Sequence, residues 1–404
     1  MNQNALILSP QTHISRPLSA PEYYHACIGT SAYTLESARE IVFVIEGLGV
    51  LPEARWQQAL GCVTTLHPGT RLRITGRRGK TRWCCDGAPT RLRFVDHVLW
   101  DSRSEIGAEF IQALPLSLEA GPSSELIITQ SQNRCVVIVR ALHAVMDGRG
   151  ALFFLQELFR ALRGESLLGT NAFFSDVDLI RSVGTTKSTS KHRKTVALTG
   201  SAQGGERGDT WRRITLFGQH KNVLARVAKA MAIFTHQHSD LPALIAVPID
   251  LRRHAPALHS TLNFSSMLLI GLCKHETAED FQQKLNDMLL QKMETFYMQV
   301  FNWIKLLPLH WLDRLVSRTL KNEKNKTPLE TAVLSNLGLC AADAFSCDGF
   351  QAETLYGIPL KGSTFCFLFG TKDRLEITLG MPKNVASNGR LDAFLDFLQD
   401  ELTK

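Results

Sequence analysis

The feature that most constrains the fold of this chain is an apolar run that ends at a histidine. Residues 134–142 read RCVVIVRAL, a composition typical of a central strand that is buried on both faces. A short polar turn at 131–133 separates this run from a second strand-like segment at 125–129, which predicts a hairpin. His143 therefore stands where a rigid, buried strand ends.

The residues after this strand combine groups that can perform acid–base chemistry. Asp147 follows His143 by four residues, and Gly148 comes next. We expect Gly148 to adopt a conformation closed to other residues, so that a tight turn brings the carboxylate beneath the imidazole. A positioned imidazole is the commonest general base near neutral pH. Taken alone, this pattern is a weak indication of function, because such a histidine is more often a core residue with satisfied hydrogen bonds. A metal site is not indicated either, because no third ligand is evident nearby.

Length and element order predict an α/β protein of two domains. The 404 residues suit two domains of about 200 residues each better than one compact core. Residues 182–210 are rich in Ser, Thr, Gly and Lys and nearly free of large apolar side chains, so we expect a linker or crossover there. The predicted domains are therefore 1–181 and 211–404, each a mixture of helices and mixed sheets.

Hydropathy periodicity sets the expected elements of both halves. Strands are predicted at 40–46, 69–74, 81–85, 211–217, 243–248, 263–272, 331–335, 364–370 and 375–381. Helices are predicted at 52–66, 150–164, 221–234, 278–306, 309–320 and 389–402. The helices between 278 and 320 are rich in Met, Phe and Trp, so they either line an acceptor pocket or pack in the core.

Composition disfavours several other classes of protein. The apolar runs are of strand length, well below the ~20 residues that a bilayer requires, so no membrane span is expected. The N-terminus has no basic region before a long apolar run, which argues against a secretory signal and predicts a cytoplasmic protein. The nine cysteines are scattered without a CxxC pair, so neither a disulfide framework nor a structural zinc site is expected.

The net charge is +7, and part of it is concentrated at 71–82, where Arg and Lys recur. A positive field suits an acidic partner, such as a phosphate-bearing cofactor or an acidic carrier protein. A solvated hairpin with charged edges explains the stretch equally well. Nucleic acid is not an expected partner, because the basic residues are not interleaved with aromatic ones and no nucleic-acid motif is present.

Five further elements, in order along the chain, make the histidine motif more specific. They are HPGTRLR at 67–73, PLSL at 115–118 with GP at 121–122, PIDLRR at 248–253, Asn263, and SNLG at 335–338. Together with the HxxxDG pattern at 143–148, they resemble the acyltransferases related to chloramphenicol acetyltransferase. That superfamily includes the condensation domains of nonribosomal peptide synthetases, the polyketide-associated and wax-ester acyltransferases, and the plant BAHD enzymes. The resemblance extends over nearly the whole chain.

The chain also departs from parts of this superfamily. Condensation domains usually carry two consecutive histidines, and here the first position is Leu142. The DFGWG motif of the BAHD branch is missing, and no adenylation or carrier module accompanies the motif. A free-standing acyltransferase is therefore the better match.

The resemblance implies both a fold and a reaction. Its members consist of two chloramphenicol-acetyltransferase-like domains set in a V, with the active site in a tunnel between them. An acyl thioester on a pantetheine arm, from acyl-CoA or a phosphopantetheinyl carrier protein, enters from one face, and a small-molecule alcohol or amine enters from the other. Carried onto this sequence, His143 is the general base. No covalent acyl-enzyme and no tightly bound cofactor are implied, and many such proteins act as monomers.

The resemblance also suggests roles for other residues. Asp147 is expected to pair with Arg252 and to hold the turn that carries His143. Ser335 and Asn336 either donate hydrogen bonds to the oxyanion or only shape a turn, and Asn263 is expected in the tunnel wall. A non-catalytic member that binds an acyl or carrier partner is the alternative, which Leu142 leaves open. A hydrolase is less favoured because a GxSxG nucleophile elbow is absent.

Overall fold

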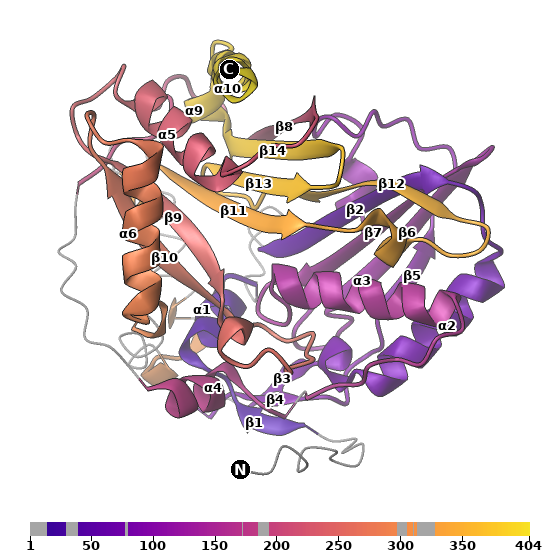
Figure 1. The fold of residues 1–404 in the computed structure, drawn as a ribbon. Helices are drawn as coiled ribbons and strands as arrows, with labels where there is room; N and C mark the ends of the chain where they lie inside the picture. The colour runs from indigo at the N-terminus through magenta and orange to yellow at the C-terminus, as the bar shows by residue number, and fades with distance from the viewer. Residues whose placement is uncertain are drawn as a thin grey trace.

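A computed structural model describes residues 14–29, 39–76, 80–171, 173–184, 194–296, 305–309, 311–312 and 328–404. Within these ranges two large mixed sheets and one small sheet are joined by helices, which confirms the predicted α/β class (Figure 1). The strand orders are β12-β2-β7-β6-β5, β10-β9-β11-β13-β14-β8 and β1-β4-β3. No helix in the described ranges is long and apolar enough to cross a bilayer.

The five-stranded sheet has the predicted histidine-bearing strand at its centre. It contains β2 (Glu40–Leu48), β5 (Arg91–Phe94), β6 (Ser124–Ser131), β7 (Arg134–Leu142) and β12 (Gln351–Ile358). Strand β7 pairs antiparallel with β2 on one side and with β6 on the other. Helices α2 (Glu53–Leu66) and α3 (Gly148–Leu162) run along one face of this sheet (Figure 1). The predicted hairpin and the buried, central position of the run are confirmed.

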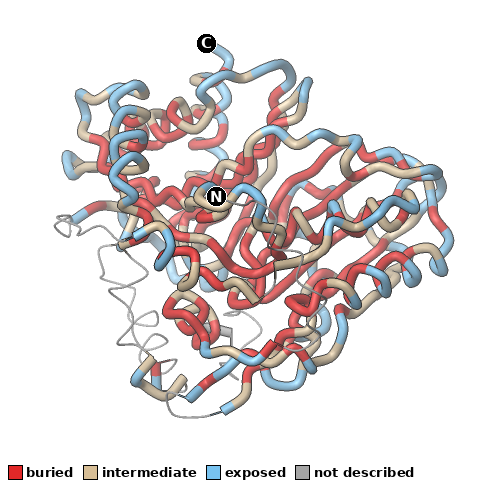
Figure 2. Tube along the Cα trace, turned by 60° about the horizontal axis from the view of Figure 1, so that its bottom comes forward, coloured by how far each residue is buried: buried red, intermediate tan, exposed pale blue. Residues whose placement is uncertain are grey.

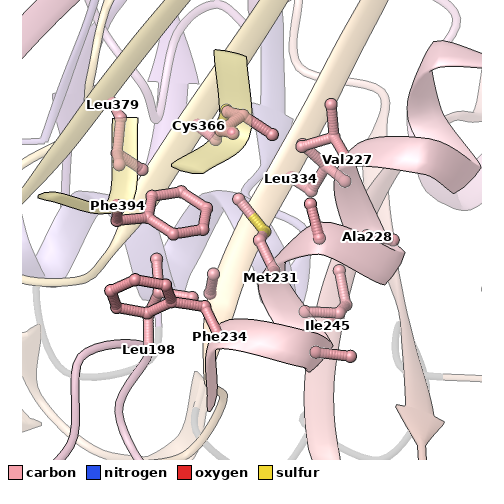
Figure 3. Close-up of a cluster of buried hydrophobic side chains, with 14 of the residues drawn as sticks. Leu198, Val227, Ala228, Met231, Phe234, Ile245, Leu334, Cys366, Leu379 and Phe394 are labelled. Carbon is pink, nitrogen blue, oxygen red and sulfur yellow. The ribbon is translucent and has the colours of Figure 1, made fainter. Parts of the chain in front are cut away.

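The six-stranded sheet comes from the second half of the chain. It contains β8 (Asp209–Phe217), β9 (Ala243–Asp250), β10 (Ser265–Leu272), β11 (Ala332–Leu339), β13 (Phe365–Gly370) and β14 (Arg374–Pro382). Its helices are α5 (Val223–Thr235), α6 (Ala278–Leu290), the short α9 (Lys383–Ala386) and α10 (Arg390–Thr403). Met231 and Phe234 of α5 meet Phe394 of α10 over the strands in one apolar core (Figure 3).

A third, smaller layer lies beneath the end of β7. It consists of β1 (Ser15–Pro17), β3 (Arg73–Thr75), β4 (Arg82–Cys84), α1 (Ala20–Gly29) and α4 (Asp176–Val183). Its core includes Tyr23 of α1 together with Leu142, Ala144 and Met146, which flank His143 on the chain. Buried residues therefore continue from the end of β7 into the layer that supports the histidine turn. Across the molecule, buried stretches lie in the interior and exposed ones in the peripheral helices and loops (Figure 2).

Some sequence-based expectations were wrong. Residues 68–71 form a 3-10 turn (η1, Pro68–Arg71), so the strand expected at 69–74 shrinks to β3. Helix α6 ends at Leu290, well before 306, and the short η4 (Met293–Thr295) follows. The helix expected at 309–320 lies mostly outside the described residues. Strand β12 was missed, and it pairs with β2 although it comes from the second half of the chain.

The expected linker is also more structured than its composition indicates. Leu198 is fully buried in the core of the six-stranded sheet. Thr195 Oγ1 lies 2.7 Å from Thr331 Oγ1, and Thr199 Oγ1 donates to the carbonyl of Val385. Hydroxyl groups thus anchor a segment that looked like a polar connection. The domain division at 182–210 stays a prediction.

Part of the basic stretch has structural partners. Arg73 donates two hydrogen bonds to Asp86, at 2.8 and 2.7 Å, and Arg82 donates to the carbonyl of Ser15 at 2.8 Å. These contacts tie β3 to the residues just after β4, and β4 to β1, within the small sheet. They favour the charged-hairpin interpretation for these two residues, whereas 77–79 lie outside the described residues.

Candidate active site

The backbone fixes the position of His143 at the end of β7. Its N–H donates to the carbonyl of Arg39 at 2.9 Å, which extends the pairing of β7 with β2 by one residue. The carbonyl of Leu142 then accepts from the N–H groups of Val145 (2.8 Å) and Met146 (3.1 Å), closing a tight turn. The side chains of Leu142, Val145 and Met146 are buried, so the turn is anchored from below.

The side chain of Asn263 holds this turn by hydrogen bonding. Its Nδ2 donates to the carbonyl of His143 at 2.7 Å and lies 3.3 Å from the Nδ1 atom of the ring. Its Oδ1 accepts from the backbone N–H (3.0 Å) and the hydroxyl (2.8 Å) of Ser265. A backbone N–H can only donate and a carbonyl can only accept, so these two partners fix the orientation of the amide. Asn263 was expected in a tunnel wall, and the structure places it against His143 itself.

A second imidazole, which the sequence analysis missed, covers the ring of His143. His25 of α1 stacks on it with the ring centroids 4.0 Å apart and the planes inclined by 17°. Tyr24 meets His25 edge-on at 5.4 Å, and the guanidinium of Arg39 lies 5.8 Å from the Tyr24 ring centroid. No spacing in the sequence connects residue 25 with residue 143. The only hint was the aromatic cluster at 23–25, in a segment to which no element had been assigned.

Both imidazoles are held in the neutral form. The pKa of His143 is lowered to about 4, chiefly by burial and in part by the charge of Arg39, although hydrogen bonds to the backbone of the turn and the charge of Asp147 act in the opposite direction. Burial also holds the pKa of His25 well below its usual range, and the charges of His143 and Arg39 add to this effect. His143 still keeps part of its surface exposed. A neutral, partly accessible imidazole has a lone pair that can accept a proton.

Asp147 supports the turn from the side of α3. It is the N-cap of that helix, and its Oδ1 accepts from the N–H of Gly150 at 2.6 Å. Its Oδ2 accepts from the N–H of Phe264 at 2.6 Å and from Nη1 of Arg252 at 2.9 Å. One buried carboxylate thus joins the histidine turn, the start of α3 and the segment before β10. This arrangement suits a structural role for Asp147.

Arg252 is surrounded by acceptors. Its Nη1 donates to Asp147 and to Asp250 Oδ1, each at 2.9 Å, and its Nη2 donates to the carbonyls of Leu262 (2.6 Å) and Ser260 (3.2 Å). The guanidinium also lies over the ring of Phe264, 4.9 Å from its centroid. The contact expected between Asp147 and Arg252 is therefore present, and it spans the two large sheets.

The expected reason for Gly148 was wrong. Gly148 is the first residue of α3 and its φ is not positive, and an added Cβ would lie 3.4 Å from Phe43 and 3.5 Å from Leu337, which is ordinary contact. The close approach occurs two residues later. A Cβ on Gly150 would lie 2.3 Å from the carbonyl oxygen of Thr261, so this is the glycine that lets the 260–264 segment pack on α3.

Ser335 and Asn336 lie on β11, opposite Phe367 and Leu368 of β13. Ser335 is buried, and Oδ1 of Asn336 accepts from the N–H of Gly338 at 2.9 Å, where the strand pairing is interrupted. This contact fits the turn-shaping interpretation of Asn336. Within the described residues no hydrogen bond joins either side chain to His143, and no group of three or more His, Cys, Asp or Glu is placed to hold a metal ion.

Comparisons by sequence and by structure give different results. No protein-family model and no curated relative matches the chain by sequence. Among solved structures, the first condensation domain of the calcium-dependent antibiotic synthetase, in complex with a substrate analogue, matches with a TM-score of 0.68 at 16% identity, covering 98% of this chain and 96% of that one.

A variant of the starter condensation domain of the rhizomide synthetase RzmA, in complex with C8-CoA and Leu-SNAC, matches with a TM-score of 0.65 at 15% identity, covering 96% of this chain and 95% of that one. The starter condensation domain of RzmA, described with no substitution or ligand, matches with a TM-score of 0.62 at 15% identity, covering 97% of each chain. At these identities the likeness establishes the fold. The chain has the fold of condensation domains, as the resemblance predicted.

Proposed function

We propose, from this fold and the geometry around His143, that the protein is an acyltransferase. It moves an acyl group from a pantetheine thioester, acyl-CoA or an acylated carrier protein, to the hydroxyl or amine of a small molecule. The observation that carries the proposal is the neutral, partly exposed imidazole at the end of β7, held by backbone hydrogen bonds. The acyl-CoA and aminoacyl thioester analogue bound by the RzmA domain show that this fold accommodates such ligands.

The reaction follows from what a neutral imidazole can do. His143 accepts the proton of the acceptor O–H or N–H while the acceptor oxygen or nitrogen attacks the thioester carbonyl. The tetrahedral intermediate then collapses, the C–S bond breaks, and the thiolate takes up the proton from the imidazolium. The products are an ester or amide and a free thiol. The step requires the tautomer with the hydrogen on Nδ1, the nitrogen beside Asn263, so that the lone pair of Nε2 faces the acceptor; backbone hydrogen bonds of the ring within the turn support this tautomer.

Other residues act around this step. Asp147 and Arg252 hold the turn, and Asn263 fixes the backbone carbonyl of His143. Ser335 and Asn336 remain proposed oxyanion donors, and a V-shaped pair of domains with a tunnel between them remains the proposed substrate route. No tightly bound cofactor is required. A cytoplasmic location and a monomeric state also stay predictions.

A binding protein without catalysis is the second candidate, and one observation favours it. Leu142 is buried in the core where condensation domains usually have a histidine. A protein of this kind would bind an acyl thioester without releasing thiol. Acyl-CoA binding alone therefore does not distinguish the two candidates, whereas turnover does.

The test is thiol release from acetyl-, octanoyl- and palmitoyl-CoA, with and without a panel of alcohols and amines. We expect release that depends on an acceptor, and a loss of about 10²–10⁴-fold in His143→Ala. His275→Ala removes an exposed histidine and should leave the rate unchanged. An equal rate in His143→Ala would refute the proposal, and release without any acceptor would indicate a hydrolase.

A further inference from the structure

The site contains a second imidazole that the proposed reaction does not use. His25 stacks on His143, and its helix is fixed to the same layer as the histidine turn. Tyr23, Ala26 and Cys27 of α1 are buried in one core with Leu142, Ala144 and Met146. The hydroxyl of Tyr23 also donates to the carbonyl of Leu307 at 2.5 Å. The helix therefore presents the His25 ring to His143 from a rigid support.

The contact between the two rings is made through their faces. The centroid distance of 4.0 Å and the inclination of 17° describe a stacked pair, whereas hydrogen-bonded imidazoles would meet edge to edge. Nδ1 of His25 is buried and has no hydrogen-bond partner among the residues that the structure describes. His25 thus acts on His143 by covering one face of its ring. The Nδ1 atom of His25 offers no hydrogen bond along which a proton could be passed on.

The charges around the pair favour a neutral His25. Arg39, the residue before β2, and His143 both oppose a positive charge on His25, and Tyr24 packs against it in a T-shaped contact. His143 in turn faces Asp147 and Arg39. An imidazolium on His143 would therefore lie beside one neutral aromatic face, which attracts a cation. A second charge at this distance would repel it.

We propose that His25 is a positioning residue: its stacked ring holds the His143 imidazole in the orientation that directs the proton-accepting nitrogen at the acceptor. This inference rests on the proposed function of His143. It assigns His25 no proton of its own to transfer. An aromatic ring without nitrogen should therefore replace it, whereas an aliphatic side chain of similar size should not.

Three variants separate stacking from other roles. His25→Phe keeps a flat ring, His25→Leu keeps volume without a ring, and His25→Ala opens space beside His143. We expect His25→Phe to retain kcat within about threefold and His25→Leu to lose about 10–100-fold in kcat with little change in KM, because a catalytic group that is misplaced costs rate. Thermal melts of each variant, with His275→Leu as the matched surface control, verify the fold.

A second readout does not depend on turnover. In protein with ¹⁵N-labelled histidine, the His143 signals are assigned with His143→Ala and then followed against pH. We expect His25→Ala to admit water and to raise the pKa of His143 from about 4, with the acid limb of the kcat/KM profile moving the same way. His25→Phe should leave both unchanged.

The outcomes are distinct. Wild-type kcat and an unchanged His143 titration in both His25→Leu and His25→Ala would overturn the inference. A loss in His25→Phe as large as in His143→Ala would also overturn it, because it would make His25 a participant in proton transfer. If the wild-type protein transfers no acyl group, the proposed function fails by itself, and the titration still reports whether the stack controls His143.

Discussion

Two arginines near the end of β7, Arg140 fully buried and Arg252 partly exposed, each pair with two carboxylates but connect different parts of the fold. Arg140 lies on β7 and pairs with Glu40 (2.9 Å) and Glu125 (2.9 Å), which are on the two neighbouring strands of the same sheet. Arg252 follows β9 and pairs with Asp147 across the two large sheets and with Asp250, the last residue of β9. Each arginine thus serves two carboxylates, but only one of the clusters connects separate parts of the fold.

Because of this difference, we expect the Arg140 cluster to affect mainly stability and the Arg252 cluster to affect activity as well. The Arg140 cluster is completed by the carbonyls of Ile111 and Leu114, which belong to the segment that covers the same sheet. Its loss should weaken the sheet as a whole. The Arg252 cluster is attached to the residue that ends the histidine turn, so its loss should displace His143 even where the protein stays folded. Buried ion pairs of equal geometry can therefore have unequal consequences for function.

The largest expected effect on stability comes from Arg140→Met. It leaves Glu40 with the amide of Gln112 but without its charged partner, and it removes one of the partners of Glu125, so we expect the free energy of unfolding to fall by about 3–5 kcal/mol. Activity per folded molecule should change little. Urea melts measure the first quantity, and active-site-normalised rates measure the second. Arg134→Met, which breaks an exposed pair with Glu353, is the control and should have no measurable effect.

For Arg252→Met we expect a smaller loss of stability and a larger loss of activity than for Arg140→Met. It should destabilise the protein by about 2–4 kcal/mol, because Asp147 loses its charged partner, and it should lower kcat about 10²-fold because the turn shifts. Asp147→Asn keeps an N-cap for α3. The double variant should therefore lose less stability than the sum of the two single variants. Strict additivity, with kcat unchanged, would remove the distinction between the two arginines.

A smaller effect should distinguish two glycines at the Arg252 cluster. Gly150→Ala forces a Cβ against the carbonyl of Thr261, so backbone must move, and we expect a loss of about 1–3 kcal/mol together with reduced kcat. Gly148→Ala should cost less than about 1 kcal/mol, since its Cβ meets Phe43 and Leu337 at ordinary distances. Paired thermal melts and rates test this. Equal effects would mean that the 260–264 segment does not pack tightly on α3.

These cases show which parts of the molecule a sequence can predict. Strand β7 and helix α3 follow from periodicity, because local pattern determines their buried faces. The contact of Asp147 with Arg252 was expected through a family resemblance, since no local rule joins residues so far apart. Whether Gly148 or Gly150 must lack a side chain depends on the segment that packs against it, and this contact is made only in the folded protein. For Gly148, the expected special backbone conformation was wrong, and its place at the active site stays a prediction.

Contacts made only in three dimensions account for the rest. His25 stacks on His143 because α1 folds under the histidine turn, and nothing in the spacing of the two residues indicates this. Strand β12 was missed because its sequence, QAETLYGI, lacks the near-continuous β-branched run that marks β7, and its pairing with β2 of the other half of the chain appears only in the structure. Asn263 was identified through the resemblance, but its place against the carbonyl of His143 required the geometry.

The smallest expected effect concerns a third arginine with two acidic neighbours. Arg16 pairs with Glu22 at 2.6 Å, and Asp176 is buried near both, so burial and the charge of Glu22 raise the pKa of Asp176 to about 7. The unfolded chain releases this proton near pH 4, so the folded state binds it more tightly, and stability falls as pH rises from about 4 through 7. Asp176→Asn should remove this fall and be more stable than wild type by about 1–2 kcal/mol at pH 8, with little difference near pH 4.

Urea melts of both proteins at several pH values give the difference directly, because other titrating groups cancel. Parallel curves would show that Asp176 is ionised throughout, and that this cluster accommodates both of its negative charges.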